Sequence, residues 1–255
     1  MSEQRYAVYS DCIHTPSSYV IEGFSLERDK HKVVAAYDTD NAVSDMRNVL
    51  DLSTAWLPLA AEKYFISANI KDYVFVPVCI FSSVLPNRNA VAFPLEKLVE
   101  FNPESGQCGF ETFRRKCLFK DHNNKDITKS YGTIFDSKMF PMRKSVGGLF
   151  KTVLLTGWDR TKNPELVNDI LTGKRDNYSM GSWSNTFFCS ICGNDYGKNG
   201  DCEHIKFGKP DTMREYNGKL SYLNVGSVCG FETSSVNAGA FHQFSQSNKE
   251  LLFTL

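Results

Sequence analysis

Four potential metal ligands lie close together in the second half of the chain, and they constrain its folding more than any other feature. The pattern is Cys-x2-Cys-x9-Cys-x-His, formed by Cys189, Cys192, Cys202 and His204. Thiolate sulfur and imidazole nitrogen are ligands that zinc prefers, and four of them complete a tetrahedral site. Because no position would remain for water or substrate, the pattern predicts a structural zinc ion that staples the loop 185–206.

Glycines within this loop support a metal site over a chance grouping of four residues. Gly193, Gly197 and Gly200 lie between the second and third cysteines and can supply the tight turns that a metal knuckle needs. A zinc knuckle that stacks nucleic-acid bases is a further alternative, because the loop also carries aromatic residues. Its acidic residues leave no positive excess, which argues against nucleic-acid binding.

The composition narrows the classes of function. The chain has 255 residues and a hydrophobic fraction of 42%, enough for one domain or for one domain with an appended piece. Its 29 basic residues balance its 29 acidic residues, so no overall charge favours nucleic acid or an anionic membrane. No apolar run reaches the roughly 18 residues that span a membrane, and the first residues lack an apolar signal core. We therefore expect neither secretion nor a membrane partner, and we do not expect nucleic acid as a partner.

The remaining cysteines do not suggest a disulfide framework. The chain has eight cysteines, of which three belong to the metal pattern. Without a secretion signal, disulfides are not expected, and dispersed cysteines are usually buried free thiols. We predict that state for Cys12, Cys79, Cys108, Cys117 and Cys229.

The hydrophobic pattern predicts an α+β fold dominated by strands. A short helix is expected at 163–171, with Asn163 as its N-cap, Pro164 in its first turn and Gly173 after its end. Further helices are predicted at 94–99 and, interrupted near Pro58, at 44–65. The predicted architecture is a mostly antiparallel β-barrel or open sheet with a few flanking helices and the zinc-stapled loop. The main predicted strands are 73–84, 133–135, 150–155, 177–183, 219–225 and 228–236.

A serine in the strand before the metal pattern raises the question of nucleophilic catalysis. Ser179 is followed by Met180 and Gly181. Serine becomes a nucleophile only when a base, usually histidine, takes its proton. His122 stands in a polar turn after an apolar segment and is a candidate base. From the residues alone, a packed strand serine and a solvated loop histidine are the commoner interpretation.

An ordered set of motifs resembles the prohead (head-maturation) serine proteases of tailed bacteriophages, which are similar to the herpesvirus assemblin fold. The resemblance covers roughly residues 84–240, most of the chain, and its specificity lies in the order and spacing of motifs that are weak individually. The motifs lie at 119–122, 132–136, 153–160, 178–181, 189–204 and 230–238.

The resemblance implies that Ser179 is the nucleophile and His122 the general base. Our first choice for a third, orienting residue is Asp159, which ends a predicted strand between the two. Glu232, on a closing strand, is the second choice. Asp121 is least favoured, because neighbours on an extended chain face opposite sides. Backbone N–H groups of the glycine-rich loop at 147–148 are candidates for an oxyanion hole.

The function implied by the resemblance is a serine endopeptidase that cleaves scaffold or core proteins and the major capsid protein during phage head maturation. It would act in the host cytoplasm, inside the assembling prohead or virion, and a homo-oligomer is compatible with the sequence. Related proteases favour a glutamate before the cleaved bond, so residues 20–23 are a candidate self-cleavage site. The zinc loop would then lie near the nucleophile.

Two departures from the pattern keep an alternative open. The closing motif has Gly239-Ala240 where the family usually carries Pro-Ala, and the first 70 residues match no known pattern. The alternative is a catalytically inactive, protease-fold structural protein of the capsid or virion core. The expected organisation is an N-terminal segment at 1–70, followed by a protease-like domain at 71–240 and a tail at 241–255. The sequence leaves three roles open for the N-terminal segment: a propeptide, a targeting arm or an integral part of the barrel.

Overall fold

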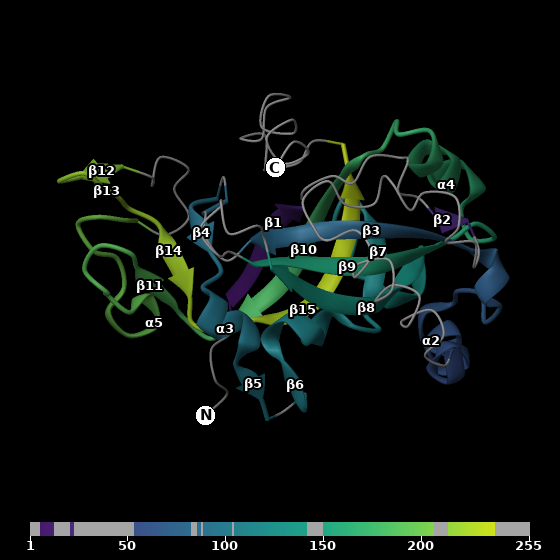
Figure 1. Cartoon of the computed structure of the whole chain (residues 1–255), viewed down its shortest axis with the longest axis horizontal. Coiled ribbons are helices and arrows are strands. Elements are labelled where there is room, and N and C mark those ends of the chain that lie inside the picture. Colours follow the sequence, from purple (N-terminus) through teal and green to yellow (C-terminus); the bar gives the residue numbers. More distant parts are fainter. Residues whose placement is uncertain are drawn as a thin grey trace.

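An eight-stranded sheet forms the centre of the molecule (Figure 1). The computed structural model describes residues 6–12, 21–22, 54–82, 86–87, 89–103, 105–141, 150–206 and 214–237. The strand order is β1-β10-β15-β7-β8-β9-β3-β2. The strands are β1 (Tyr6–Cys12), β2 (Ile21–Glu22), β3 (Tyr73–Ser82), β7 (Cys117–Lys120), β8 (Gly132–Pro141), β9 (Phe150–Asp159), β10 (Asn177–Ser184) and β15 (Cys229–Val236).

The sheet is mostly antiparallel and open. Every neighbouring pair runs antiparallel except β15 and β7, which are parallel. Although β3 also lies against β1, backbone pairing among the described residues follows only this linear order. The α+β prediction is therefore confirmed, and the open sheet rather than the closed barrel is the one that forms.

Short helices and three small sheets surround the main sheet. In Figure 1 the sheets β11-β14-β4 and β12-β13 gather with α5 at one end of the long axis, and α2 and α4 lie at the other. The α-helices among the described residues are α2 (Leu57–Tyr64), α3 (Leu95–Val99), α4 (Pro164–Leu171) and α5 (Tyr196–Asn199). The 3-10 helices in the same parts of the chain are η3 (Thr54–Trp56), η4 (Ile70–Asp72), η5 (Gly109–Phe113) and η6 (Ile127–Lys129). The minor strands are β4 (Val91–Ala92), β5 (Phe101–Asn102), β6 (Gln107–Cys108), β11 (Phe187–Cys189), β12 (Glu215–Tyr216), β13 (Lys219–Leu220) and β14 (Leu223–Val225).

The helix α4 is capped as the sequence predicts. The Asn163 side chain accepts a hydrogen bond from the Leu166 N–H, Pro164 stands in the first turn, and Gly173 follows in the left-handed region at φ 73°. Of the helix predicted at 44–65, residues 44–53 lie outside the described residues, and in α2 Pro58 stands in the first turn, where proline is tolerated. The predicted strand 219–225 is two strands, β13 and β14, in different sheets.

The core lies on both faces of the main sheet. Along β3 the side chains alternate: Val74 and Val76 belong to the larger apolar cluster, and Tyr73 and Phe75 to the smaller one. Helix α4 contributes to the larger cluster and α2 to the smaller. Because both faces are covered, the strands of the sheet centre are held in place by packing from two sides.

The described parts of the first 70 residues belong to this sheet and core. Strand β1 pairs with β10 along its length, β2 pairs with β3, and α2 packs in the smaller cluster. The remainder of that segment, the proposed self-cleavage site apart from Ile21–Glu22, and the tail 241–255 lie outside the described residues. In the described part of the chain, none of the helices combines the length and apolar character that crossing a membrane requires.

Candidate active site and metal centre

The central strands bring Ser179, His122 and Glu232 to one place. In the antiparallel pair β10–β15, Ser179 lies opposite Ser234 and Gly181 lies opposite Glu232. These facing residues point to the same side of the sheet. The parallel strand β7 lies next to β15, and the chain leaves β7 after Lys120 directly into the turn that carries His122.

A continuous hydrogen-bonded chain joins the three side chains. The distance from His122 Nε2 to Ser179 Oγ is 2.8 Å, and the distance from His122 Nδ1 to Glu232 Oε1 is 2.7 Å. An ionised carboxylate can only accept hydrogen bonds, so Nδ1 carries the proton in a neutral ring. Nε2 is then the acceptor for the Ser179 hydroxyl, which is the arrangement in which histidine can act as a base toward serine.

The second carboxylate oxygen of Glu232 is also occupied. Glu232 is fully buried, and its Oε2 accepts a hydrogen bond of 2.6 Å from Ser234 Oγ. A buried charge is tolerated only when it is paired and hydrogen-bonded, and His122 and Ser234 supply both partners. Sequence reasoning did not identify Ser234. Its only signal is its position two residues after Glu232, which puts both side chains on one face of the strand.

The turn that carries His122 has an unusual backbone. Asp121 and His122 have φ values of 53° and 54°, in the left-handed region that only a few per cent of non-glycine residues adopt. Each such residue costs on the order of 1–3 kcal/mol. The turn is closed by hydrogen bonds from Asn123 N to Lys120 O and from Asp121 N to Ser235 O. With this turn, the imidazole lies between Glu232 on β15 and Ser179 on β10.

Gly181 leaves room for the Glu232 carboxylate. A Cβ atom at Gly181 would lie 2.9 Å from Glu232 Oε1 and 2.5 Å from Cζ of Phe231. Since real Cβ atoms do not approach other atoms so closely, any side chain here would displace the carboxylate or the ring. The glycine two residues after the serine is therefore part of the site.

Asp159, our first choice for the orienting residue, does not reach His122. Its Oδ1 accepts hydrogen bonds from Thr161 and Lys162, and its Oδ2 accepts one from the Ser67 N–H. Strand β8 separates β9, which Asp159 ends, from β7. The geometry corrects the assignment: Asp159 closes the turn after β9, and Glu232, the second choice, holds the histidine. The loop at 147–148 lies outside the described residues.

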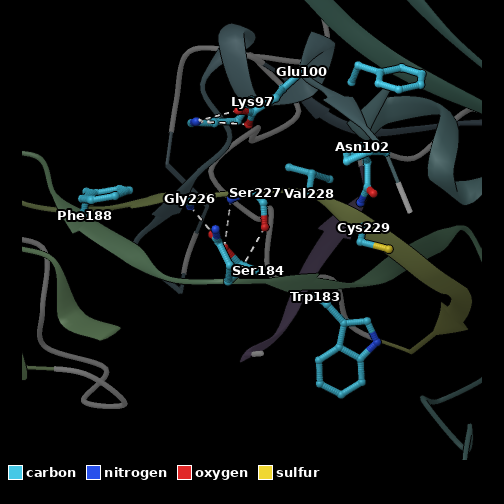
Figure 2. A pocket seen from close by; sticks show the side chains of 13 residues that line it. Lys97, Glu100, Asn102, Trp183, Ser184, Phe188, Gly226, Ser227, Val228 and Cys229 are labelled. Atoms are coloured by element: carbon cyan, nitrogen blue, oxygen red, sulfur yellow. Dashed lines mark hydrogen bonds and ion pairs between the residues drawn. The ribbon is translucent and has the colours of Figure 1, made fainter. Parts of the chain in front are cut away.

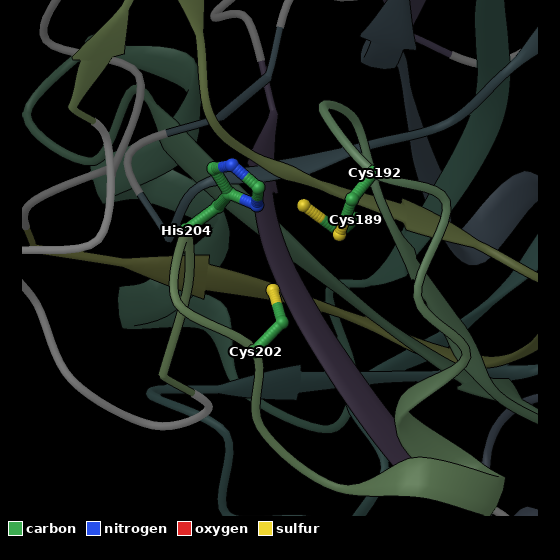
Figure 3. A group of neighbouring side chains, drawn as sticks. All are labelled: Cys189, Cys192, Cys202 and His204. Atoms are coloured by element: carbon green, nitrogen blue, oxygen red, sulfur yellow. The ribbon is translucent and has the colours of Figure 1, made fainter.

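The four predicted metal ligands meet at a second site (Figure 3). The ligand atoms of Cys189, Cys192, Cys202 and His204 all lie within 4.8 Å of one another. His204 Nδ1 is buried without a hydrogen-bond partner, as expected for an atom that faces a metal ion. The arrangement is close enough to bind a metal ion, with three sulfurs and one nitrogen as the donor set.

Turns and hydrogen bonds prepare this cluster. Gly193 and Gly200 adopt left-handed φ values of 70° and 68°, which confirms the turns predicted there. Burial raises the pKa of Cys202, but hydrogen bonds from Tyr196 and from backbone groups outweigh it and lower that pKa to about 6. Burial raises the pKa of Cys189 instead. Thiolates are the metal-binding form of cysteine, so the lowered pKa of Cys202 favours the form that binds a metal ion.

The metal cluster lies at the opposite end of β10 from Ser179. Ser179 is near the start of the strand, and the cluster begins beyond its end at Ser184. At about 3.3 Å per residue, the strand separates them by roughly 16 Å. The expectation that the metal loop lies near the nucleophile was therefore wrong: the loop belongs to the far end of the molecule.

A cavity of about 400 Å³ also lies at this far end (Figure 2). Its lining includes Lys97, Asn102, Trp183, Ser227 and Cys229. None of the three hydrogen-bonded residues Ser179, His122 and Glu232 lines it. The cavity is therefore separate from the site where Ser179 and His122 meet.

No protein-family model, curated protein or solved structure matches this chain. The comparisons thus supply no family for the chain. Its function has to be argued from the two sites themselves and from the resemblance of its motifs.

Proposed function

We propose that this chain is a serine endopeptidase with Ser179 as nucleophile, His122 as general base and Glu232 as the orienting carboxylate. The observation that carries the proposal is the unbroken chain of hydrogen bonds from Ser179 Oγ through both ring nitrogens of His122 to Glu232. Serine, histidine and a buried acid in this order form the arrangement that activates serine on unrelated folds.

In the proposed mechanism, each of the three side chains has its own role. His122 Nε2 takes the hydroxyl proton as Ser179 Oγ attacks a peptide carbonyl, and the same nitrogen gives the proton to the leaving amine. Water, deprotonated by His122, then releases the acyl group from Ser179. Glu232 holds Nδ1–H and stabilises the imidazolium that forms. Its burial strengthens this interaction, because the local dielectric constant is low.

The substrate class of the proposal rests on the motif resemblance to prohead proteases. Scaffold or core proteins and the major capsid protein of an assembling phage head are the proposed substrates, cleaved inside the prohead. The proposed metal is zinc, because three thiolates and one imidazole suit its preferred tetrahedral site. Zinc would hold the loop between Cys189 and His204 together, and it takes no part in the cleavage steps.

One observation favours a second candidate, a catalytically inactive structural protein. Ser179 is fully buried, whereas the His122 side chain is 29% exposed. A peptide carbonyl reaches Ser179 Oγ only after the atoms that cover it move. If no substrate or partner drives that movement, the protein keeps the triad geometry without peptidase activity.

The test is labelling with a fluorophosphonate, which reacts only with an activated serine. The chain is purified after co-expression with scaffold and capsid proteins, and mass spectrometry locates both the labelled residue and any cleaved bonds. Labelling at Ser179 and cleavage that disappear in Ser179→Ala support the peptidase. Intact scaffold and no label in the wild type, with the fold retained, would establish the structural alternative.

A further inference from the structure

Arg175, which lies just before β10, is buried, and all three nitrogens of its guanidinium group donate hydrogen bonds. Its side chain is only 7% exposed. Nε donates to Ser235 Oγ at 3.0 Å, and Nη1 donates to Asn237 Oδ1 at 2.8 Å. Nη2 donates to Asp121 Oδ1 at 2.6 Å and to Ser235 O at 2.9 Å. The arginine therefore joins the end of β15 to the turn that carries the catalytic histidine.

These contacts converge on the left-handed turn. Ser235 O accepts from both Arg175 Nη2 and the Asp121 N–H, so a single carbonyl group anchors the arginine and the turn together. Asp121 and His122 are the two consecutive left-handed residues. A turn in a strained backbone conformation persists only where its surroundings hold it there. Asp121 precedes His122, and its hydrogen bonds with Arg175 and Ser235 stabilise the left-handed backbone of the turn.

We infer that Arg175 is a positioning residue, which acts through Asp121 to keep the His122 ring between Glu232 and Ser179. The inference deepens the proposed function and rests on it. The planar guanidinium is suited to this role because it donates to three residues in fixed directions, which a lysine ammonium on its flexible stem cannot reproduce. Asp121, the residue least favoured for direct contact with His122, thus has an indirect part in placing it.

The experiment compares Arg175→Met, Arg175→Lys and Asp121→Ala with the wild-type chain. For Arg175→Met we expect kcat, or the rate of fluorophosphonate labelling, to fall about 100-fold with little change in KM, because a displacement of about 1 Å in the catalytic base has this effect. Arg175→Lys should recover only part of the loss. Asp121, whose side chain is 45% exposed, can be replaced with less risk to folding. Asp121→Ala should match Arg175→Met, and the double variant should be no slower than either single one.

Arg114→Met is the matched control. Arg114 also pairs with carboxylates, Glu111 and Asp136, before β7. Its loss should lower stability without changing kcat. If Arg175→Met and Asp121→Ala fold and also leave kcat within about twofold of the wild type, the positioning role is excluded and the cluster is structural only.

A second readout separates this inference from the proposed function. The proton on His122 Nδ1, bonded to Glu232, gives a downfield NMR resonance that can be assigned by its absence in His122→Ala. The resonance should be lost or shifted in Arg175→Met and Asp121→Ala but kept in Arg114→Met. If the wild type shows no labelling while this pattern holds, the peptidase proposal fails and the positioning role stands. An unchanged resonance in both variants would overturn the positioning role.

Discussion

The two ends of β10 are built in different ways. At the Ser179 end, the interacting residues are far apart in sequence: Ser179 lies 57 positions after His122, and Glu232 lies 110 positions after it. At the other end, the four potential metal ligands lie within residues 189–204. The first site exists only when the central strands are in register, whereas the second requires little more than a local loop and an ion. Changes at the two ends should therefore affect different properties.

The largest expected effect comes from Ser179→Ala. Removing the nucleophile should lower kcat by on the order of 10⁶-fold. Metal content and thermal stability should stay at wild-type values, because the metal cluster lies at the other end of β10. Peptide cleavage assays, metal analysis and calorimetry measure the three quantities. A variant that still cleaves scaffold protein would remove Ser179 from its proposed role.

Glu232→Gln should have the next largest effect. The amide keeps the size of the side chain, but it no longer fixes the tautomer of His122 that carries its proton on Nδ1. We therefore expect kcat to fall by about 10⁴-fold. Asp159→Asn is the matched control. Asp159 is buried and closes the turn after β9, so this variant should lose stability but keep its kcat. Equal losses of kcat in the two variants would contradict the assignment of Glu232.

Cys192→Ser tests the metal end. Loss of one of four ligands should abolish stoichiometric metal binding and lower the free energy of unfolding by about 4 kcal/mol. The rate of fluorophosphonate labelling, measured well below the melting temperature, should stay close to the wild-type rate although the stability falls. Cys229→Ser, at a cysteine outside the cluster, should retain the metal. Full metal content and stability in Cys192→Ser would show that the four ligands are wrongly assigned.

Gly181→Ala should have the smallest effect of the four. The new methyl group would meet Phe231 and the Glu232 carboxylate, and overpacking of this kind costs about 1–3 kcal/mol. Because the carboxylate is one of the atoms displaced, we expect a loss of kcat as well as of stability. Gly193→Ala is the comparison at the metal end, where, among the described residues other than its two chain neighbours, no atom lies within 4 Å of the added methyl group. It should lower stability through its backbone conformation and leave kcat unchanged.

Features set by neighbouring residues could be predicted from the sequence. The metal cluster, its turns at Gly193 and Gly200, and the capped helix α4 depend on residues only a few positions apart. The pairing of His122 with Ser179 came from the order of motifs, and the structure brings the two side chains into hydrogen-bond contact.

Features set by the order of strands could not be predicted. Choosing Glu232 over Asp159 requires knowing that β7 lies beside β15 and is separated from β9 by β8. The β15–β7 pair is parallel, so no hairpin turn in the sequence marks it. Whether the sheet closes into a barrel depends on contacts between its first and last strands, which no local pattern encodes. The position of Arg175 could not be predicted because its partners, Asp121 and Ser235, come together only in the folded sheet.

The position of β15 also determines when the proposed catalytic site can form during synthesis. Among the described strands of the main sheet it is the last to leave the ribosome, yet it lies between β10 and β7, and it carries Glu232. A nascent chain that already contains the serine and the histidine still lacks the strand that joins them. The enzyme that we propose would therefore stay inactive until β15 has left the ribosome and paired with β10 and β7.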